Sequence, residues 1–165
     1  MKRITLISFI TLLLGCAGFA ACAPGEAVRE RNVETVKTFL RLLEEEKIGD
    51  YLELYADNGK QVNPYGSGIV PPEVSGKAAL REFWEPVPGR FDGMEFPIKA
   101  IHPMQDPNKV LVHFDGRIKL KGDAGFYNNE YFALFTFNED GKIVEYVEIF
   151  NPLTIVRAFG LKDQI

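Results

Sequence analysis

The chain has 165 residues, of which 46% are apolar and 25% are charged, an ordinary balance for one globular domain. Its net charge of −4 argues against nucleic acid as a partner, because binding phosphates requires a basic face. Both cysteines, Cys16 and Cys22, lie near the N-terminus, so the rest of the chain has no thiol for catalysis, disulfides or thiolate metal sites.

The N-terminal segment has the pattern of an export leader. A basic start is followed by the apolar run Ile4 to Leu14, which is too short to span a bilayer comfortably, and then by small residues. Residues 1–22 resemble a bacterial lipoprotein leader, which implies that Cys22 is lipidated and anchors a periplasmic or outer-membrane-attached protein. Cys16 is a rival site. Simple secretion after cleavage near Ala20 and an uncleaved anchor are the alternatives.

Helical patterns come next. We read residues 23–32 as a tether and the start of a helix that runs from Val28 to Lys47, with Gly49 after its end. Asp50 can cap a short second helix over residues 51–56. Apolar residues recur at spacings of three and four along the first helix, which predicts an amphipathic helix packed on a core: Val33, Val36, Phe39, Leu40 and Leu43.

A turn, a short strand and a loop lead to a third helix. Asp57-Asn58-Gly59 is a turn signal, residues 60–63 read as a strand, and residues 65–72 read as a loop rich in glycine and proline. Ser75-Gly76-Lys77 opens a helix through Trp84, which Pro86 stops.

The second half of the chain reads as strands. Residues 94–101 form a strand that Pro97 interrupts, which favours an edge position. Three longer runs, rich in β-branched and aromatic residues and separated by glycine-containing turns, predict an antiparallel meander: 109–121, 126–137 and 142–151. Residues 153–159 can form a final helical turn.

The first strand of the meander has two different faces. His113, Asp115 and Arg117 alternate along it and therefore share one face, while the opposite face is apolar, with Val110, Val112, Phe114 and Ile118. We interpret the polar face as the lining of a pocket. The apolar face then needs another cover, which a second copy of the chain in a homodimer would supply.

The order of these elements sets the fold class. Helices come first and an antiparallel sheet follows, so the class is α+β. A long curved sheet wrapped around the N-terminal helices gives a cone-shaped α+β barrel with a cavity inside.

Several sequence pieces carry a resemblance to a known family. They are Glu53 to Gly59, Ser75 to Lys77, Asp106 to Gly116, Tyr127 to Phe132, Asp140 to Ile143 and Glu148 to Asn151. In their order and gaps they resemble the SnoaL-like, or nuclear transport factor 2-like, superfamily, nearest the phenazine-biosynthesis A/B group. The resemblance implies one such domain over residues 33–160.

The resemblance also implies site residues. The phenazine group has an acid/base on its last strand, and Glu148 occupies that place, although Phe83 stands where the group has a histidine. The limonene-epoxide-hydrolase relatives have an Arg-x-Asp pair on one strand, and His113-Phe114-Asp115 falls there with His in place of Arg. Asn63 falls near their water-positioning Asn.

The residues themselves support Glu148 as a candidate. It shares a face with Tyr146 and Phe150, and such apolar surroundings raise the pKa of a carboxyl group toward values useful for proton transfer. We predict Glu148, Asp115 and His113 as catalytic residues. The residues predicted to bind a small apolar molecule are Asn63, Tyr65, Trp84, Tyr131 and Tyr146.

No metal or other cofactor is predicted. The chain has two histidines, and His102 precedes Pro103 in a turn away from His113. Three functions remain open: a cofactor-free hydrolase, isomerase or cyclase, a non-catalytic module that binds a small ligand, and a dimerising adaptor at the membrane face. One fold of this kind hosts many functions.

Overall fold

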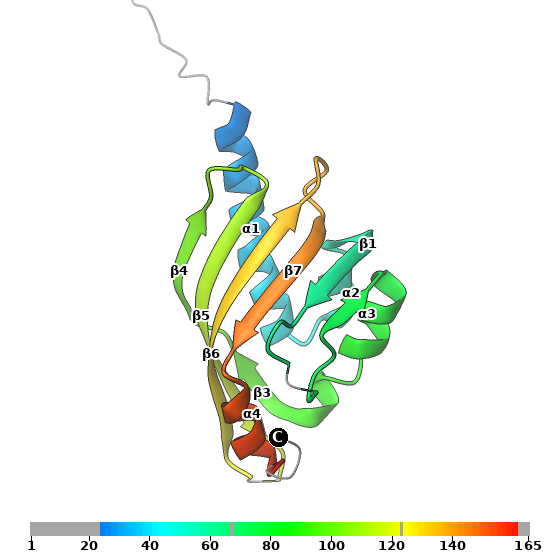
Figure 1. Ribbon diagram of the computed structural model, residues 1–165, viewed down its shortest axis with the longest axis vertical. Coiled ribbons are helices and arrows are strands. Elements are labelled where there is room, and N and C mark those ends of the chain that lie inside the picture. The colour runs from blue at the N-terminus through cyan, green and yellow to red at the C-terminus, as the bar shows by residue number, and fades with distance from the viewer. Residues whose placement is uncertain (1–23, 67, 123, 162–165) are drawn as a thin grey trace, which may run out of the picture.

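The computed structural model describes residues 24–66, 68–122 and 124–161 (Figure 1). Its helices are α1 (Pro24–Glu44), α2 (Ile48–Leu52), α3 (Lys77–Trp84) and α4 (Pro152–Phe159), with a 3-10 turn at Pro88–Arg90. Its strands are β1 (Tyr55–Val62), β2 (Glu73–Ser75), β3 (Phe91–Glu95), β4 (Ile98–Pro103), β5 (Lys109–Leu120), β6 (Phe126–Phe137) and β7 (Ile143–Phe150).

The predicted leader and Cys22 lie outside the described residues, so export and lipidation stay predictions. Within the ranges that the structure describes, no helix has both the length and the apolar character needed to cross a membrane.

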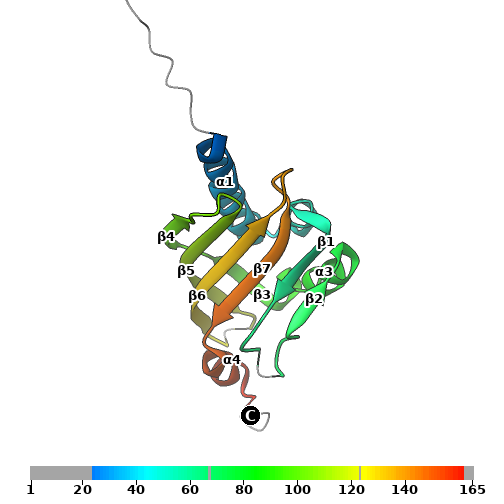
Figure 2. The same ribbon diagram turned by 45° about the horizontal axis from the view of Figure 1, so that its top comes forward.

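The strands form one curled sheet, which Figures 1 and 2 show from two directions. Its hydrogen-bonded order is β2-β1-β7-β6-β5-β3, and β4 also pairs with β5. Strands β1 and β7 run parallel, whereas the other pairs are antiparallel. The predicted meander is therefore confirmed as β5, β6 and β7, and the α+β class is confirmed with it.

Helix α1 packs against the concave side of this sheet (Figure 2). The predicted apolar stripe is buried, with Val36 and Phe39 fully inaccessible to solvent. The helix begins at Pro24 and ends at Glu44, not at residues 28 and 47. It ends early because Glu46 adopts a left-handed conformation, with φ of 57°, and the backbone N–H groups of the turn bond back to the last carbonyls.

Strand β1 differs most from the prediction. The expected turn at 57–59 lies inside β1, where the register against β7 shifts between Tyr55 and Lys60. The turn-forming residues therefore build a bulge in a strand. A Cβ added at Gly59 would lie 2.7 Å from the carbonyl oxygen of Ile143, so glycine allows this close approach. The expected short second helix is present, but as α2 (Ile48–Leu52) and not over 51–56, with Lys47 and not Asp50 at its N-cap. Tyr55 is buried against the core and begins β1.

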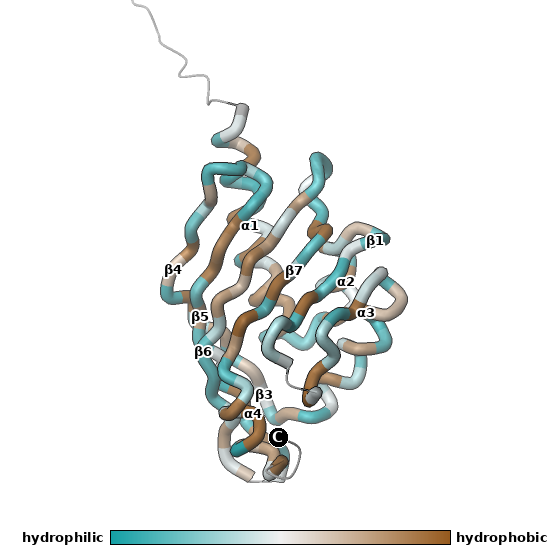
Figure 3. Tube along the Cα trace, in the orientation of Figure 1, coloured by the Kyte–Doolittle hydropathy of each residue, from teal (hydrophilic) through white to brown (hydrophobic). Residues whose placement is uncertain are grey.

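The strand break at Pro97 is confirmed. It separates β3 from β4, and both pair with the same neighbour, β5, at this end of the sheet. Helix α4 follows β7 directly and is capped by Asn151, whose side-chain oxygen accepts a hydrogen bond of 3.0 Å from the backbone N–H of Leu153. Figure 3 shows hydrophilic residues gathered in the turns between β4 and β5 and between β6 and β7.

The two faces of β5 lie the opposite way round from the prediction. The apolar set is the buried one: Val110, Val112, Phe114 and Ile118 are at most 5% exposed and face the core. His113 and Asp115 lie on the outer face. The apolar face is thus covered by the protein's own helices and cavity walls, and the expected reason for a dimer through it does not hold.

A homodimer stays a prediction, and the outer face of the sheet is where we now place it. Phe132 and Ile149 are register partners there, each 41% exposed, beside the ion pair of Lys99 and Asp115. We expect light scattering at micromolar concentration to show a dimer and Phe132→Glu to give a monomer. Phe126→Glu, at another exposed phenylalanine of the same strand, is the control that should stay dimeric; a monomeric unmodified protein would contradict the prediction.

Candidate functional site

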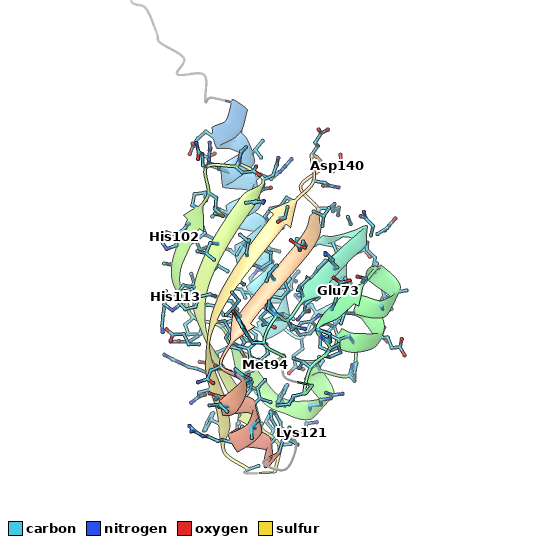
Figure 4. All side chains as sticks on the ribbon, in the orientation of Figure 1. Glu73, Met94, His102, His113, Lys121 and Asp140 are labelled. Atoms are coloured by element: carbon cyan, nitrogen blue, oxygen red, sulfur yellow. The ribbon has the colours of Figure 1, made fainter. Side chains whose placement is uncertain are left out.

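A cavity of about 690 Å³ lies between the concave face of the sheet, α3, α4 and the loop before β2. Its walls are mostly apolar and aromatic, and Figure 4 shows one lining residue, Met94, in the interior of the molecule. Other apolar lining residues include Phe83, Phe91, Phe96, Phe114, Ile118, Phe150, Ile155 and Phe159. A cavity of this size and character suits a small apolar molecule.

Glu148, on the central strand β7, places a carboxyl group in the wall of the cavity. Its Oε1 atom accepts a 2.9 Å hydrogen bond from the Tyr146 hydroxyl, and its Oε2 atom accepts a longer one, 3.3 Å, from Gln61. Removal from water raises the pKa of Glu148 to about 7, although the bond from Tyr146 acts in the opposite direction. The carboxyl group can therefore take up and release a proton near neutral pH.

A chain of oriented amides supports Glu148. The indole N–H of Trp84 donates to Gln61 Oε1 at 2.9 Å, so the nitrogen of the Gln61 amide must point the other way. That nitrogen donates to Glu148 and, at 3.0 Å, to Asn63 Oδ1. Asn63 in turn donates to the carbonyl oxygen of Pro71 at 2.8 Å. Because the Gln61 nitrogen can only donate, it cannot take a proton from Glu148.

A second polar group lies on β6. The Tyr127 and Tyr131 hydroxyls are 2.9 Å apart, and both side chains line the cavity. Burial raises the pKa of both phenols above the usual value, and the negative charge of Glu148 adds to the effect, so both keep their protons. Asn129, between them on the same strand, donates to the Tyr127 oxygen at 2.9 Å.

Four of the residues predicted to bind a ligand line this cavity. They are Asn63, Trp84, Tyr131 and Tyr146, and they come from the segment after β1, from helix α3 and from the strands β6 and β7. Tyr65 does not line it, because its side chain is 58% exposed in the loop between β1 and β2.

The predicted grouping of His113 and Asp115 with Glu148 is wrong. On the outer face, Asp115 pairs with Lys99 at 2.6 Å, and His113 contacts Glu130 at 2.7 Å and stacks on Phe132. Figure 4 shows His113 at the edge of the molecule. Since Glu148 faces inward, the sheet separates it from both residues. In a strand with one apolar face, polar residues face solvent.

Two polar residues of the site, Gln61 and Asn129, were missed as candidates. Gln61 lies on β1 two residues before Asn63, so strand alternation places both on one face, and this signal could have identified it. Asn129 follows the same rule with respect to Tyr127 and Tyr131 on β6. Their hydrogen bonds to one another have no separate trace in the sequence.

Gly116 makes room for Tyr131, and this gives a test of the site geometry. A Cβ at Gly116 would lie 2.6 Å from a ring carbon of Tyr131, which stacks on Phe114 at 5.0 Å. We expect Gly116→Ala to displace the ring and to lower the free energy of unfolding by about 1–3 kcal/mol. Urea unfolding measures this change in the free energy of unfolding. Gly89→Ala, where the added Cβ meets no atom within 4 Å, should cost little, and equal stability of both variants would contradict the geometry.

The chain is similar to a known family of domains and to a bacterial protein. A family model described as "SnoaL-like domain" matches residues 36–146. The chain is 28% identical over 133 residues to the uncharacterized protein YesE of Bacillus subtilis (strain 168), covering 79% of this chain and 88% of that one.

Two solved structures are similar over nearly their whole length. A Bacillus subtilis protein described as a candidate isomerase superposes with a TM-score of 0.72 at 25% identity, covering 81% of this chain and 95% of that one. A phenazine biosynthesis-related protein of Pseudomonas aeruginosa superposes with a TM-score of 0.68 at 25% identity, covering 82% and 89%.

Proposed function

Since the chain belongs to the SnoaL-like domain family, we propose that it catalyses proton transfer on a small apolar molecule, with Glu148 as the acid/base. The reaction is of the isomerase, cyclase or hydrolase type and needs no cofactor. The observation that carries the proposal is a carboxyl group with a pKa of about 7 in the wall of a mostly apolar cavity.

The hydrogen bonds around Glu148 support this role. Tyr146 and Gln61 both donate to the carboxylate, so they hold it in one orientation while it carries a negative charge. When Glu148 takes a proton on Oε2, the Gln61 nitrogen cannot accept it, and the proton is available to a ligand in the cavity. The same carboxyl group can then remove a proton from one ligand atom and deliver it to another.

The alternative is a module that binds the same kind of ligand without chemistry. Both readings use the cavity, and they differ in whether the proton on Glu148 moves. We favour catalysis because a buried carboxyl group has an unfavourable charged form, which a pure binding site for an apolar molecule has no need to keep.

The test is the pH dependence of turnover. We propose to screen small apolar epoxides, ketones and polyketide-like compounds and to follow kcat/KM of any substrate between pH 4.5 and 9. Because the ionised form of Glu148 must begin the reaction as a base, kcat/KM should fall about tenfold per pH unit below about 7. An ordinary glutamate would give that fall only below about 4.3.

Two outcomes would contradict the proposal. Saturable binding without turnover for every compound favours the binding module. Turnover that stays constant from pH 7 to pH 5 shows that another group carries the proton.

A further inference from the structure

The hydrogen bonds that Asn129 makes beside Tyr127 and Tyr131 on β6 fix the orientation of its side-chain amide. The Asn129 side-chain oxygen accepts from the backbone N–H groups of Glu130 and Asn151, at 2.9 and 3.2 Å. Its amide nitrogen must therefore face the other way, where it donates to the Tyr127 hydroxyl and to the carbonyl oxygen of Asn151. Asn129 thus uses all four of its hydrogen-bonding positions, and Tyr127 can only be an acceptor from it.

In this arrangement, one hydroxyl proton of the Tyr127–Tyr131 pair is left without an acceptor among the residues that the structure describes. Tyr127 and Tyr131 have two hydroxyl protons, and one of them makes the bond between the two oxygens. The other has no acceptor among the hydrogen bonds that the described residues make. Tyr131 is 5% exposed and Tyr127 6%, and both line the cavity, so the acceptor for this proton has to come from what the cavity holds. An unused donor in a buried wall costs free energy unless water or a ligand in the cavity accepts from it.

The donor lies close to the proposed acid/base. In the register of β6 and β7, Glu148 faces Ala133, and Tyr131 is two residues along the same face. Such diagonal neighbours lie roughly 7–8 Å apart, and their Cβ atoms are somewhat closer. The residue between them in the pattern, Ala133, has only a methyl side chain. One small molecule can therefore reach the hydroxyl pair and Glu148 together.

We propose that the Tyr127–Tyr131 pair is a hydrogen-bond donor site for an uncharged acceptor oxygen, such as a ketone carbonyl, on the apolar ligand. The ligand is uncharged at this oxygen because an anion would be repelled by ionised Glu148 in the same cavity. This inference rests on the proposed function, because it takes the ligand to be the molecule on which Glu148 acts. Its test measures binding and does not depend on turnover.

The experiment compares two probes of nearly the same shape in the full chain. Cyclohexyl phenyl ketone carries the carbonyl oxygen, and benzylcyclohexane lacks it. Trp84, the chain's one tryptophan, lines the cavity and reports binding through its fluorescence. We expect the ketone to bind about tenfold more tightly than the hydrocarbon, the effect of one buried hydrogen bond. In the double variant Tyr127→Phe/Tyr131→Phe this preference should disappear.

A matched control comes from the other buried tyrosine pair. The Tyr51 and Tyr55 hydroxyls lie 3.2 Å apart, but neither residue lines the cavity, so Tyr51→Phe should keep the full ketone preference. Glu148→Gln should keep it as well, even if turnover is lost, which separates this inference from the proposed function.

A second measurement needs no variant. Infrared spectra of the bound ketone should show its carbonyl stretch at a lower frequency than in an apolar solvent, because an accepted hydrogen bond weakens the C=O bond. Equal affinity of the two probes, binding of neither, an unshifted stretch, or a preference that survives in the double variant would each overturn the assignment.

Discussion

Replacing Glu148 by glutamine is expected to lower turnover of a substrate by about 10²-fold or more. Glutamine keeps the shape of the side chain and can still accept from Tyr146, but it cannot exchange a proton near neutral pH. Ligand affinity should change much less, because the cavity walls stay the same. Steady-state kinetics of both forms, with binding measured separately, would show kcat reduced and Kd nearly unchanged.

Glu145 provides the matched control for this substitution. It lies on the same strand but on the outer face, where it pairs with Lys60 at 3.1 Å. Glu145→Gln makes the same chemical change outside the cavity and should leave turnover within a factor of two. Equal turnover of Glu148→Gln and the unmodified protein would exclude Glu148 as the proton carrier.

The same variant has an expected effect on stability that depends on pH. The pKa of Glu148 is raised to about 7 in the folded chain, so between its unfolded value and about 7 the folded state binds more protons and stability falls as pH rises. Above pH 7 this burial of charge costs on the order of 3 kcal/mol. Glu148→Gln should therefore be more stable than the unmodified protein at pH 8 and differ little at pH 4, as thermal unfolding at both values would show.

The parts of the fold that follow simple periodicity were predictable. The meander follows from alternating runs closed by glycine turns, and α1 follows from an apolar stripe at spacings of three and four. The bounds were less exact where tertiary packing decides them. Tyr55 begins a strand because its ring is buried against Phe39, a contact between segments that the local pattern does not show.

The candidate site was predictable only in part. Glu148 was identified from its aromatic neighbours on one face of β7, and the resemblance supported it. His113 and Asp115 were placed beside it because the polar face of their strand was interpreted as the lining of a pocket and the resemblance agreed, against the rule that the polar face of a strand meets solvent. Their actual partners, Lys99 and Glu130, come from β4 and β6, and only the sheet register brings them together.

Tyr146, which holds Glu148, packs against Phe39 of helix α1. Substitution of Phe39 should therefore affect both the stability of the protein and its turnover. Phe39 is fully buried, and its ring centroid lies 4.6 Å from that of Tyr51 and 4.8 Å from those of Phe135 and Tyr146. Phe39→Ala leaves a void among these rings that the surrounding backbone cannot fully close. We expect the free energy of unfolding to fall by about 3–5 kcal/mol, a large share of the roughly 5–15 kcal/mol of an ordinary domain.

Thermal unfolding should record this loss as a Tm lower by on the order of 10 °C. Tyr146, released on one side, should hold Glu148 less firmly, and turnover should fall even at temperatures where the variant is folded. Phe126→Ala is the control, since that ring is 64% exposed and its removal should cost under about 0.5 kcal/mol. A Phe39→Ala protein that loses less than about 1 kcal/mol would show that these rings are not packed as described.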